Sequence, residues 1–283
     1  VGSEVYDVSG ASENGVDAKT GLFHAHYSVA VIRGLSGNGP EIELNLHYCA
    51  TRANESALGD GWAFRFSAWD NRLHKLTLYT GQTITLTADH IDKAKGNKRL
   101  AINGVTLTGA TGSFASLTVL TVIYPSGRQE TLTRPALHDG QEASKDYKDA
   151  LLLKVRKIKE NLQKWLRESG LSTEQSSNFQ SKLDEIGKLE SEMDRKAFIL
   201  TPSQISAPQG STLTLSWEGR KGHVHLHSIA EGSIQLLTAV HEPPTATGTY
   251  TSQFTVWPDT DEAYTVSLTI EDCLLIQLKR QGL

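Results

Sequence analysis

The sequence predicts a mainly β protein: a curved antiparallel sheet made of two chain segments, with an α-helical hairpin inserted between them. Residues 1–138 and 200–283 carry short runs in which apolar and polar residues alternate between glycine-containing turns, which is typical of antiparallel strands. Residues 139–199 are instead rich in Lys, Glu, Gln and Leu, with apolar residues at helical spacing. With 38% apolar and 21% charged residues, the 283-residue chain has the composition of a globular protein.

The first β segment, residues 1–138, has turns with a clear sequence basis. Gly34–Pro40 is rich in glycine, Tyr79–Gln82 fits a tight hairpin, and Pro125–Arg128 places Pro and Gly where a β-turn uses them. The polar stretch Asp89–Gly112 is expected to be an exposed excursion with a weak strand at Leu100–Leu107. The other strand candidates are Leu22–Ile32, Glu41–Tyr48, Ala63–Trp69, Leu73–Tyr79, Gln82–Thr87, Thr118–Tyr124 and Gln129–Leu132.

The central region, residues 139–199, predicts two antiparallel helices. Gly170 is placed to end the first helix, and Ser172 or Thr173 can cap the second. We expect each apolar stripe to pack against the other helix and the sheet; docking of a partner is the alternative. The first stripe is Leu151, Leu152, Val155, Ile158, Leu162, Trp165 and Leu166, and the second is Phe179, Leu183, Ile186, Leu189 and Met193.

The second β segment, residues 200–283, resumes the strand pattern after Pro202. Glycines and the pair Pro243-Pro244 separate its runs, and Pro258 follows another. The predicted strands are Thr212–Trp217, His223–Ile229, Ile234–Val240, Thr249–Trp257, Ala263–Ile270 and Leu274–Leu278.

Charge and cysteine content narrow the classes of function. The formal net charge of −4 provides no basic field for a phosphate backbone, so no nucleic-acid partner is expected. No apolar run is long enough to span a membrane. Cys49 and Cys273 form no CxxC pair, which argues against a disulfide scaffold and a structural zinc site. The start at Val1, without a signal peptide, suggests a fragment.

Residues that could carry chemistry are few. His223, His225 and His227 alternate on one predicted strand, but same-face neighbours lie about 7 Å apart, too far for three ligands of one zinc ion. The acidic group Asp259, Asp261 and Glu262 fits a solvated loop. No GxSxG, HExxH or phosphate-binding loop is present. The sequence therefore predicts no enzyme and no catalytic, cofactor-binding or metal-binding residue.

The aromatic residues leave a second class of function open. Flat rings on an antiparallel sandwich can stack on sugars, so a carbohydrate-binding module is the alternative function. The favoured interpretation is that these rings are core residues or cross-strand anchors, as aromatic residues in strands usually are. The residues concerned are Trp62, Trp69, Tyr79, Trp217, Trp257 and Tyr264.

Several ordered motifs resemble one known family. Gly15–Phe23 resembles a "GVDPRTG" opening, with Ala18 and Lys19 in place of Pro-Arg. Similar matches follow: Gly39–Tyr48 to "GP-x-L-x-L-x-L-x-Y", Leu58–Phe64 to "G-x-GW-x-(F/L)", Leu76–Gln82 to "L-x-L-x-(S/T)-G", Val122–Glu130 to "YPDG-(R/x)-x-E", and Ile205–Trp217 to "SPQG-x-x-L-x-L-x-W". These elements are similar to the N-terminal region of RHS (YD-repeat) polymorphic toxins, including the C-type subunits of insecticidal toxin complexes.

The resemblance implies a structural role. RHS proteins wind long β strips into a hollow shell around a C-terminal toxic domain, and a continuous sheet of this kind has free edges only at its ends. The implied partners are the remaining shell, the enclosed toxin and a delivery apparatus or toxin-complex subunit. Such a protein is made in the bacterial cytoplasm, exported without a visible signal peptide and secreted. The YD repeats and the family's autoproteolytic aspartates are absent from this sequence.

Overall fold

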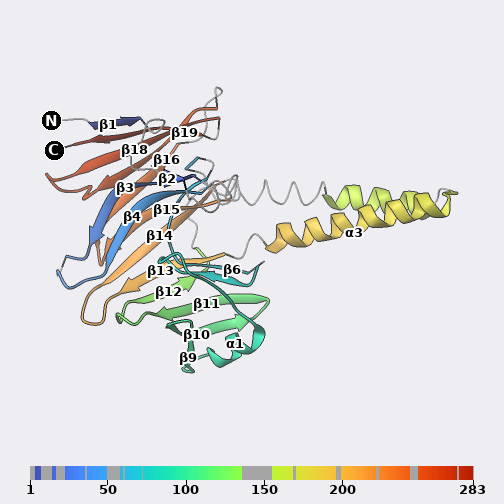
Figure 1. Cartoon of the computed structure of the whole chain (residues 1–283), viewed down its shortest axis with the longest axis horizontal. Helices are drawn as coiled ribbons and strands as arrows, with labels where there is room; N and C mark the ends of the chain where they lie inside the picture. The colour runs from blue at the N-terminus through green and yellow to red at the C-terminus, as the bar shows by residue number, and fades with distance from the viewer. Residues whose placement is uncertain are drawn as a thin grey trace.

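The computed structural model describes residues 4–7, 15–16, 23–35, 37–49, 58–59, 61–71, 73–135, 155–167, 170–195, 199–220, 223–242, 248–272 and 274–282. It is mainly β, with 54% strand, 17% helix and antiparallel sheets, as the sequence predicted. Within the described ranges, neither sheet closes on itself. The strands form one large sheet and one small sheet, and two helices project from them (Figure 1).

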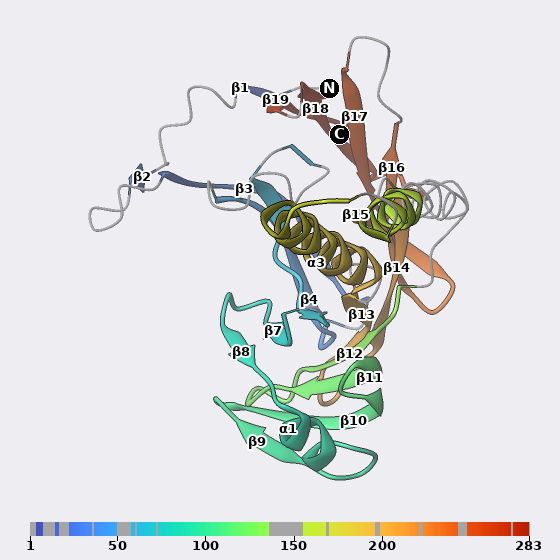
Figure 2. The same ribbon diagram turned by 90° about the vertical axis from the view of Figure 1, so that its right-hand side faces the viewer.

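The large sheet is an antiparallel meander in sequence order. It contains 15 strands, and β9 to β19 lie side by side in the order in which the chain forms them. It runs from β9 at one end of the molecule to β19, with β1 (Glu4–Asp7) beyond it (Figure 2). The bounds are β9 Leu100–Ile102, β10 Val105–Ser113, β11 Ser116–Ile123, β12 Gln129–Thr133, β13 Ile199–Ser206, β14 Thr212–Arg220, β15 His223–Glu231, β16 Ile234–His241, β17 Tyr250–Val256, β18 Tyr264–Glu271 and β19 Leu274–Gln281.

The N-terminal β segment contributes two further strand groups. The small sheet has the order β2 (Gly15–Val16), β3 (Phe23–Arg33), β4 (Glu41–Cys49) and β5 (Trp62–Phe64). The strands β6 (Ala68–Asp70), β7 (Lys75–Thr77) and β8 (Thr83–Thr85) branch from β13 of the large sheet. The predicted strand Ala63–Trp69 is therefore wrong as a single element: its two ends belong to different sheets, with residues 65–67 joining them.

Two hydrophobic cores hold these layers together. In the first, the β3–β4 hairpin packs on the large sheet, and its Leu44 and Leu46 belong to the same buried cluster as Phe254 and Leu268. The second joins β6, β7 and β8 to β10, β11 and β12 around the fully buried Trp69. Burial of apolar surface of this kind is the main favourable term in folding.

The stretch Asp89–Gly112 is part of the second core, not an exposed excursion. Thr87 caps helix α1 (Ala88–Lys93) through a capping box with His90. Ile91 and Leu107 are both fully buried in the core. The predicted weak strand is a hairpin, β9–β10, and its turn uses the left-handed residues Asn103 (φ 46°) and Gly104 (φ 84°). The exposed lysines Lys93, Lys95 and Lys98 give this segment the composition of a solvated loop.

Strands β12 and β13 pair directly although residues 134–198 separate them in the sequence. Thr133 pairs with Thr201, and Leu132 pairs with Pro202 at a register shift. A proline inside a sheet is tolerated at such an irregularity, and the Trp217 indole donates to the Pro202 carbonyl at 2.7 Å. The sequence did not predict β13 as a strand because Pro202 interrupts it.

The helical hairpin projects from the sheets instead of packing on them (Figure 1). It consists of a helix over residues 155–167 and α3 (Thr173–Arg195). Ser172 caps α3 as expected, since its hydroxyl accepts from Gln175 N at 3.3 Å and its N–H donates to Gln175 Oε1 at 3.0 Å.

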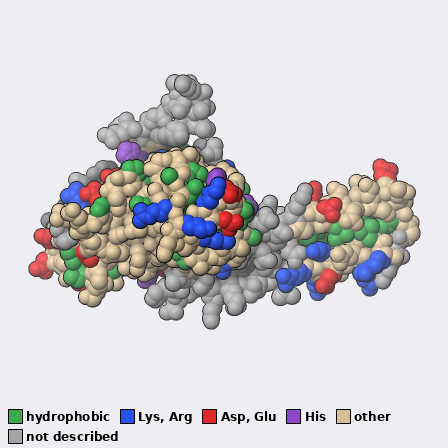
Figure 3. Space-filling model, turned by 90° about the horizontal axis from the view of Figure 1, so that it is seen from below, with side chains coloured by type: hydrophobic (Ala, Val, Ile, Leu, Met, Phe, Trp, Pro, Cys, Tyr) green, Lys and Arg blue, Asp and Glu red, His purple; other side chains and the backbone are tan. Residues whose placement is uncertain are grey.

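The packing expected of the helical stripes is partly wrong. Leu183 is buried and the Trp165 and Phe179 rings lie 6.4 Å apart, so the two helices do contact each other. Ile158 and Trp165 remain 52% and 62% exposed, and hydrophobic side chains lie along the projecting arm (Figure 3). Leu151 and Leu152 lie outside the described residues, as do the side chains of Leu189 and Met193. Among the described residues, no helix is both long and apolar enough to cross a membrane.

Candidate functional site

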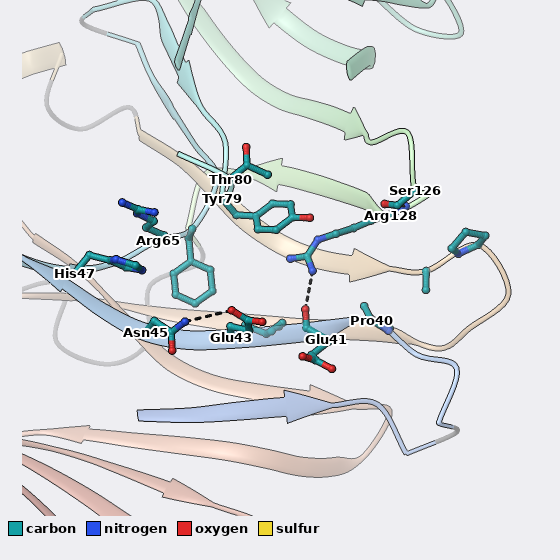
Figure 4. A pocket seen from close by; sticks show the side chains of 14 residues that line it. Pro40, Glu41, Glu43, Asn45, His47, Arg65, Tyr79, Thr80, Ser126 and Arg128 are labelled. Atoms are coloured by element: carbon teal, nitrogen blue, oxygen red, sulfur yellow. Dashed lines mark hydrogen bonds between the residues drawn. The ribbon is translucent and has the colours of Figure 1, made fainter. Parts of the chain in front are cut away.

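A groove of about 560 Å³ lies where the β3–β4 hairpin meets three turns of the other strands (Figure 4). Its lining residues come from β4, from the segment between β5 and β6, and from the β7–β8, β11–β12 and β13–β14 turns. The residues that line it include Pro40, Glu41, Glu43, Asn45, His47, Arg65, Phe66, Tyr79, Thr80, Ser126, Arg128 and Pro208.

Arg128 joins the walls of the groove. Its guanidinium donates to the Glu41 backbone carbonyl at 2.6 Å and lies 4.1 Å from the centroid of the Tyr79 ring. Its Nε and Nη2 donate to Glu130 Oε1 at 3.0 and 2.9 Å. One side chain therefore connects β4, the β7–β8 turn and β12.

A chain of buried hydrogen bonds continues from the ion pair of Arg128 and Glu130. Tyr79 N–H donates to Ser67 Oγ at 2.9 Å, the Ser67 and Tyr124 hydroxyls lie 2.9 Å apart, and Tyr124 donates to Glu130 Oε2 at 2.9 Å. Because the Tyr124 proton goes to Glu130, Ser67 donates to Tyr124. Ser67, Tyr124 and Glu130 are all buried, so each bond replaces a lost contact with water.

Tyr124 stays protonated in this environment. Burial raises the pKa of its hydroxyl well above the ordinary value, and the nearby Glu130 carboxylate raises it further. Since a protonated hydroxyl donates and a phenolate cannot, this shift keeps the hydrogen bond to Glu130 in place. The Tyr124 hydroxyl therefore holds the fold together, and its raised pKa does not favour the phenolate that would accept a proton.

The turns around the groove pack against one another at glycines. A Cβ added to Gly127, in the β11–β12 turn, would lie 2.2 Å from Pro208 Cγ in the β13–β14 turn. A Cβ added to Gly210 would lie 2.7 Å from the Asn38 carbonyl oxygen, next to Gly39 in the β3–β4 turn. Only glycine allows approaches this close, so these positions fix how the hairpins meet.

The open part of the groove carries both signs of charge. Glu41 and Glu43 are exposed on β4, with Glu43 accepting from Asn45 Nδ2 at 3.2 Å, and Arg65 is exposed opposite them (Figure 4). These groups can hydrogen-bond a polar chain laid in the groove. The buried groups, Glu130 and Tyr124, are used in holding the fold together.

The histidines predicted on one strand do lie on one strand, but His225 and His227 have different surroundings. They lie on β15, where His225 is buried against the His241 ring (centroids 4.6 Å apart) and His227 Nδ1 lies 3.4 Å from Glu218 Oε2. The side chain of His223 is outside the described residues. Within the described part of the chain, no group of three His, Cys, Asp or Glu side chains could hold a metal ion.

The six aromatic residues do not form a shared exposed face. Trp62, Trp69 and Trp217 are buried in the cores, at 6%, 0% and 6% exposure. Arg128 covers the half-buried Tyr79 ring, and Arg280 lies 4.2 Å from the centroid of the Tyr264 ring. Trp257 packs partly against the first core. The positions are those of core residues and cross-strand anchors, and they favour no sugar-binding platform.

The acidic residues Asp259, Asp261 and Glu262 are exposed in the turn between β17 and β18. They lie in a loop, as the sequence indicated. The network of Ser67, Tyr124, Arg128 and Glu130 was missed. Its local signal is the spacing of a Tyr, an Arg and a Glu around the Pro-Ser-Gly turn. The arginine directly before β12 and the glutamate in β12 are two residues apart, which is the spacing of one face of an extended chain.

No protein-family description and no curated protein matches the sequence.

Proposed function

We propose that this chain is a structural segment of an RHS-repeat toxin shell, which encapsulates a C-terminal toxic domain and helps to deliver it. The observation that carries the proposal is the position of the resembling motifs. The motif segments Gly39–Tyr48, Leu76–Gln82, Val122–Glu130 and Ile205–Trp217 each contribute residues to the walls of the groove.

The contacts between these motifs explain why their residues occur together. Arg128 of one motif binds the Glu41 carbonyl and the Tyr79 ring of two others, and Gly127 admits Pro208 of a fourth. A fifth motif makes a similar contact, since a Cβ at Gly59 would lie 2.8 Å from Leu275 N on β19. These motifs are in physical contact with one another. They therefore support a common architecture more strongly than short, unconnected matches would.

The strand topology also supports a role in the wall of a shell. A meander in which β9 to β19 follow the sequence grows by adding each new strand at the edge, which suits a long β strip. The small sheet covers one part of the meander, and β6, β7, β8 and α1 cover another. Curvature into a shell is part of the proposal.

In this proposal the partners are the remaining shell strips, the enclosed toxin and a delivery apparatus. The protein would be made in the bacterial cytoplasm and secreted, and it would act in competition between bacteria or in an insecticidal toxin complex. The segment itself has no enzymatic activity in this proposal; the toxic activity belongs to the cargo.

The test is to sequence the reading frame beyond Leu283. The proposal expects repeated Tyr-Asp motifs, then an autoproteolytic region with aspartates and a variable C-terminal segment. A frame that ends without such repeats would contradict encapsulation and leave a free-standing β protein.

A further inference from the structure

The projecting helical hairpin carries an apolar face that extends over both of its helices. In the helix over residues 155–167, Ile158, Leu162 and Trp165 follow one another at steps of four and three residues, so they lie on one side. The Trp165 ring lies 6.4 Å from the ring of Phe179 on α3. We call the surface formed by Ile158, Leu162, Trp165 and Phe179 the arm face. Figure 3 shows hydrophobic side chains along this arm.

The arm face is too exposed to be explained as an internal core. Ile158 and Trp165 are each more than half exposed, and among the described side chains of the two helices Leu183 alone is buried. The hairpin also projects away from the sheets, so no strand covers it (Figure 1). A contiguous apolar patch with a polar rim typically marks a surface that binds something else.

Lysines border the arm face on both helices. Lys157 and Lys164 each stand one residue before an exposed apolar residue, so they lie about a quarter of a turn from the apolar side of their helix. Lys182 follows Phe179 by three residues, which places these two side chains next to each other on α3. All three lysines are exposed. The rim of the face is therefore positively charged.

Nearby carboxylates do not share the arm face. Glu160 and Glu185 stand two residues from Leu162 and Leu183, and residues two apart on a helix do not face the same side. Asp184 accepts a hydrogen bond from the side-chain amide four residues earlier, at 3.2 Å. The hairpin thus combines an apolar centre with a cationic rim on one side and keeps these acidic groups away from it.

The charge of the rim distinguishes two kinds of occupant. In a two-fold dimer the same patch is used twice, so the lysines of two copies would meet and repel one another. An anionic bilayer instead offers a hydrocarbon boundary for the apolar side chains and headgroup phosphates for the lysines. Lysine stems lie along apolar surface while their ammonium groups stay in water, and tryptophan favours the interface between the two.

We propose that the arm face docks on an anionic membrane surface, with both helices lying in the headgroup region and neither crossing the bilayer. The projection of the hairpin from the sheets makes this face accessible to a flat surface (Figure 1). The inference does not depend on the proposed shell function.

The experiment is co-sedimentation of the full chain with phosphatidylcholine vesicles, prepared with and without phosphatidylglycerol. We expect binding to the anionic vesicles only, and weaker binding at high salt because the charges are screened. Trp165→Ala should weaken binding at least about tenfold, since its apolar contact is lost. Lys157→Gln/Lys182→Gln should weaken it about thirtyfold, from the lost attraction of two lysines to the surface. Lys75→Gln/Lys98→Gln, which removes two exposed lysines outside the hairpin, is the matched control.

Trp165 also reports the contact directly. Because Trp62, Trp69 and Trp217 are buried in the cores, brominated lipid should quench mainly the fluorescence of Trp165. Trp165→Phe should remove this quenching and keep most of the binding. Circular dichroism checks that Trp165→Ala keeps its helices, and the lysine variants leave the contact with Phe179 intact.

Two results would overturn the proposal. One is the absence of binding to anionic vesicles, and the other is binding that both Trp165→Ala and Lys157→Gln/Lys182→Gln retain in full. A concentration-dependent dimer that Trp165→Ala dissociates, without vesicle binding, would assign the arm face to a second copy of the chain instead.

Discussion

Gly127 and Pro208 lie in contact although they belong to different hairpins: a Cβ on Gly127 would lie 2.2 Å from Pro208 Cγ. Gly127 also has φ +84°. We predict that Gly127→Ala destabilises the protein by a left-handed penalty of about 1–2 kcal/mol plus about 1–3 kcal/mol for the steric conflict. Gly104→Ala separates the two effects, since Gly104 has the same φ and no atom within 4 Å of an added Cβ.

Urea unfolding of both variants measures the difference. Gly104→Ala should show the backbone penalty alone. Equal losses in the two variants would mean that the turns containing Gly127 and Pro208 do not pack as described.

The ion pair of Arg128 and Glu130 is predicted to contribute far more to the free energy of unfolding than the exposed pair of Arg33 and Glu41. Arg128→Ala leaves the buried Glu130 carboxylate without its cation, which typically costs about 3–5 kcal/mol. Arg33 and Glu41 are 72% and 43% exposed, so Arg33→Ala should cost no more than about 1 kcal/mol. Comparable free energies of unfolding for the two variants would rule out the buried network.

Tyr124 should give the protein a measurable dependence on alkaline pH. Tyr124→Phe removes two buried hydrogen bonds and should cost about 1–3 kcal/mol at pH 8. The pKa of Tyr124 is raised in the folded state, so ionisation favours the unfolded chain once the pH exceeds the unfolded value of about 10. The advantage of the unsubstituted protein over Tyr124→Phe should therefore shrink between pH 9 and 11. A constant difference over that range would contradict the burial of this hydroxyl.

The helical hairpin should be removable. Because Thr133 pairs with Thr201, the strands on either side already lie next to each other. Joining Pro135 to Ile199 through Asn-Gly should preserve cooperative unfolding with a melting temperature changed by only a few degrees. The far-ultraviolet circular dichroism should lose helix and keep strand. Loss of the cooperative transition would show that residues 136–198 are needed for the β fold.

The isolated chain is predicted to self-associate. In the described structure the large sheet ends in the short strands β9 and β1, and open edges of this kind pair with other chains. Sedimentation velocity over a range of concentrations should show species larger than a monomer. A single monomeric species at all concentrations would count against the prediction.

The strongest sequence signals were the long alternating runs. The strands predicted at Leu22–Ile32 and Glu41–Tyr48 match β3 and β4 to within one residue at each end, because eight or more alternating positions leave little ambiguity. No sequence pattern predicted that residues 65–67 separate β5 from β6, since alternation does not reveal which sheet a strand joins. Asn103-Gly104 did carry a hairpin signal, but the charged residues before it obscured the segment.

The groove could be predicted only in part. The turn residues around Gly127 were recognisable, but the contact from Arg128 to the Glu41 carbonyl spans 87 residues and depends on how two sheets pack. The pairing of His26 with His47 likewise depends on a register with a shift between Ser28 and Ala30. Local patterns therefore identified the elements, and the long-range packing that joins them had to come from the structure.

Electron microscopy of the complete product of the reading frame would test the shell proposal most directly. The proposal expects a hollow particle whose wall contains this chain, with the β9-to-β19 meander continued by further strands and density for a cargo inside. A particle in which this chain forms a separate β domain, with no enclosed cavity, would contradict it.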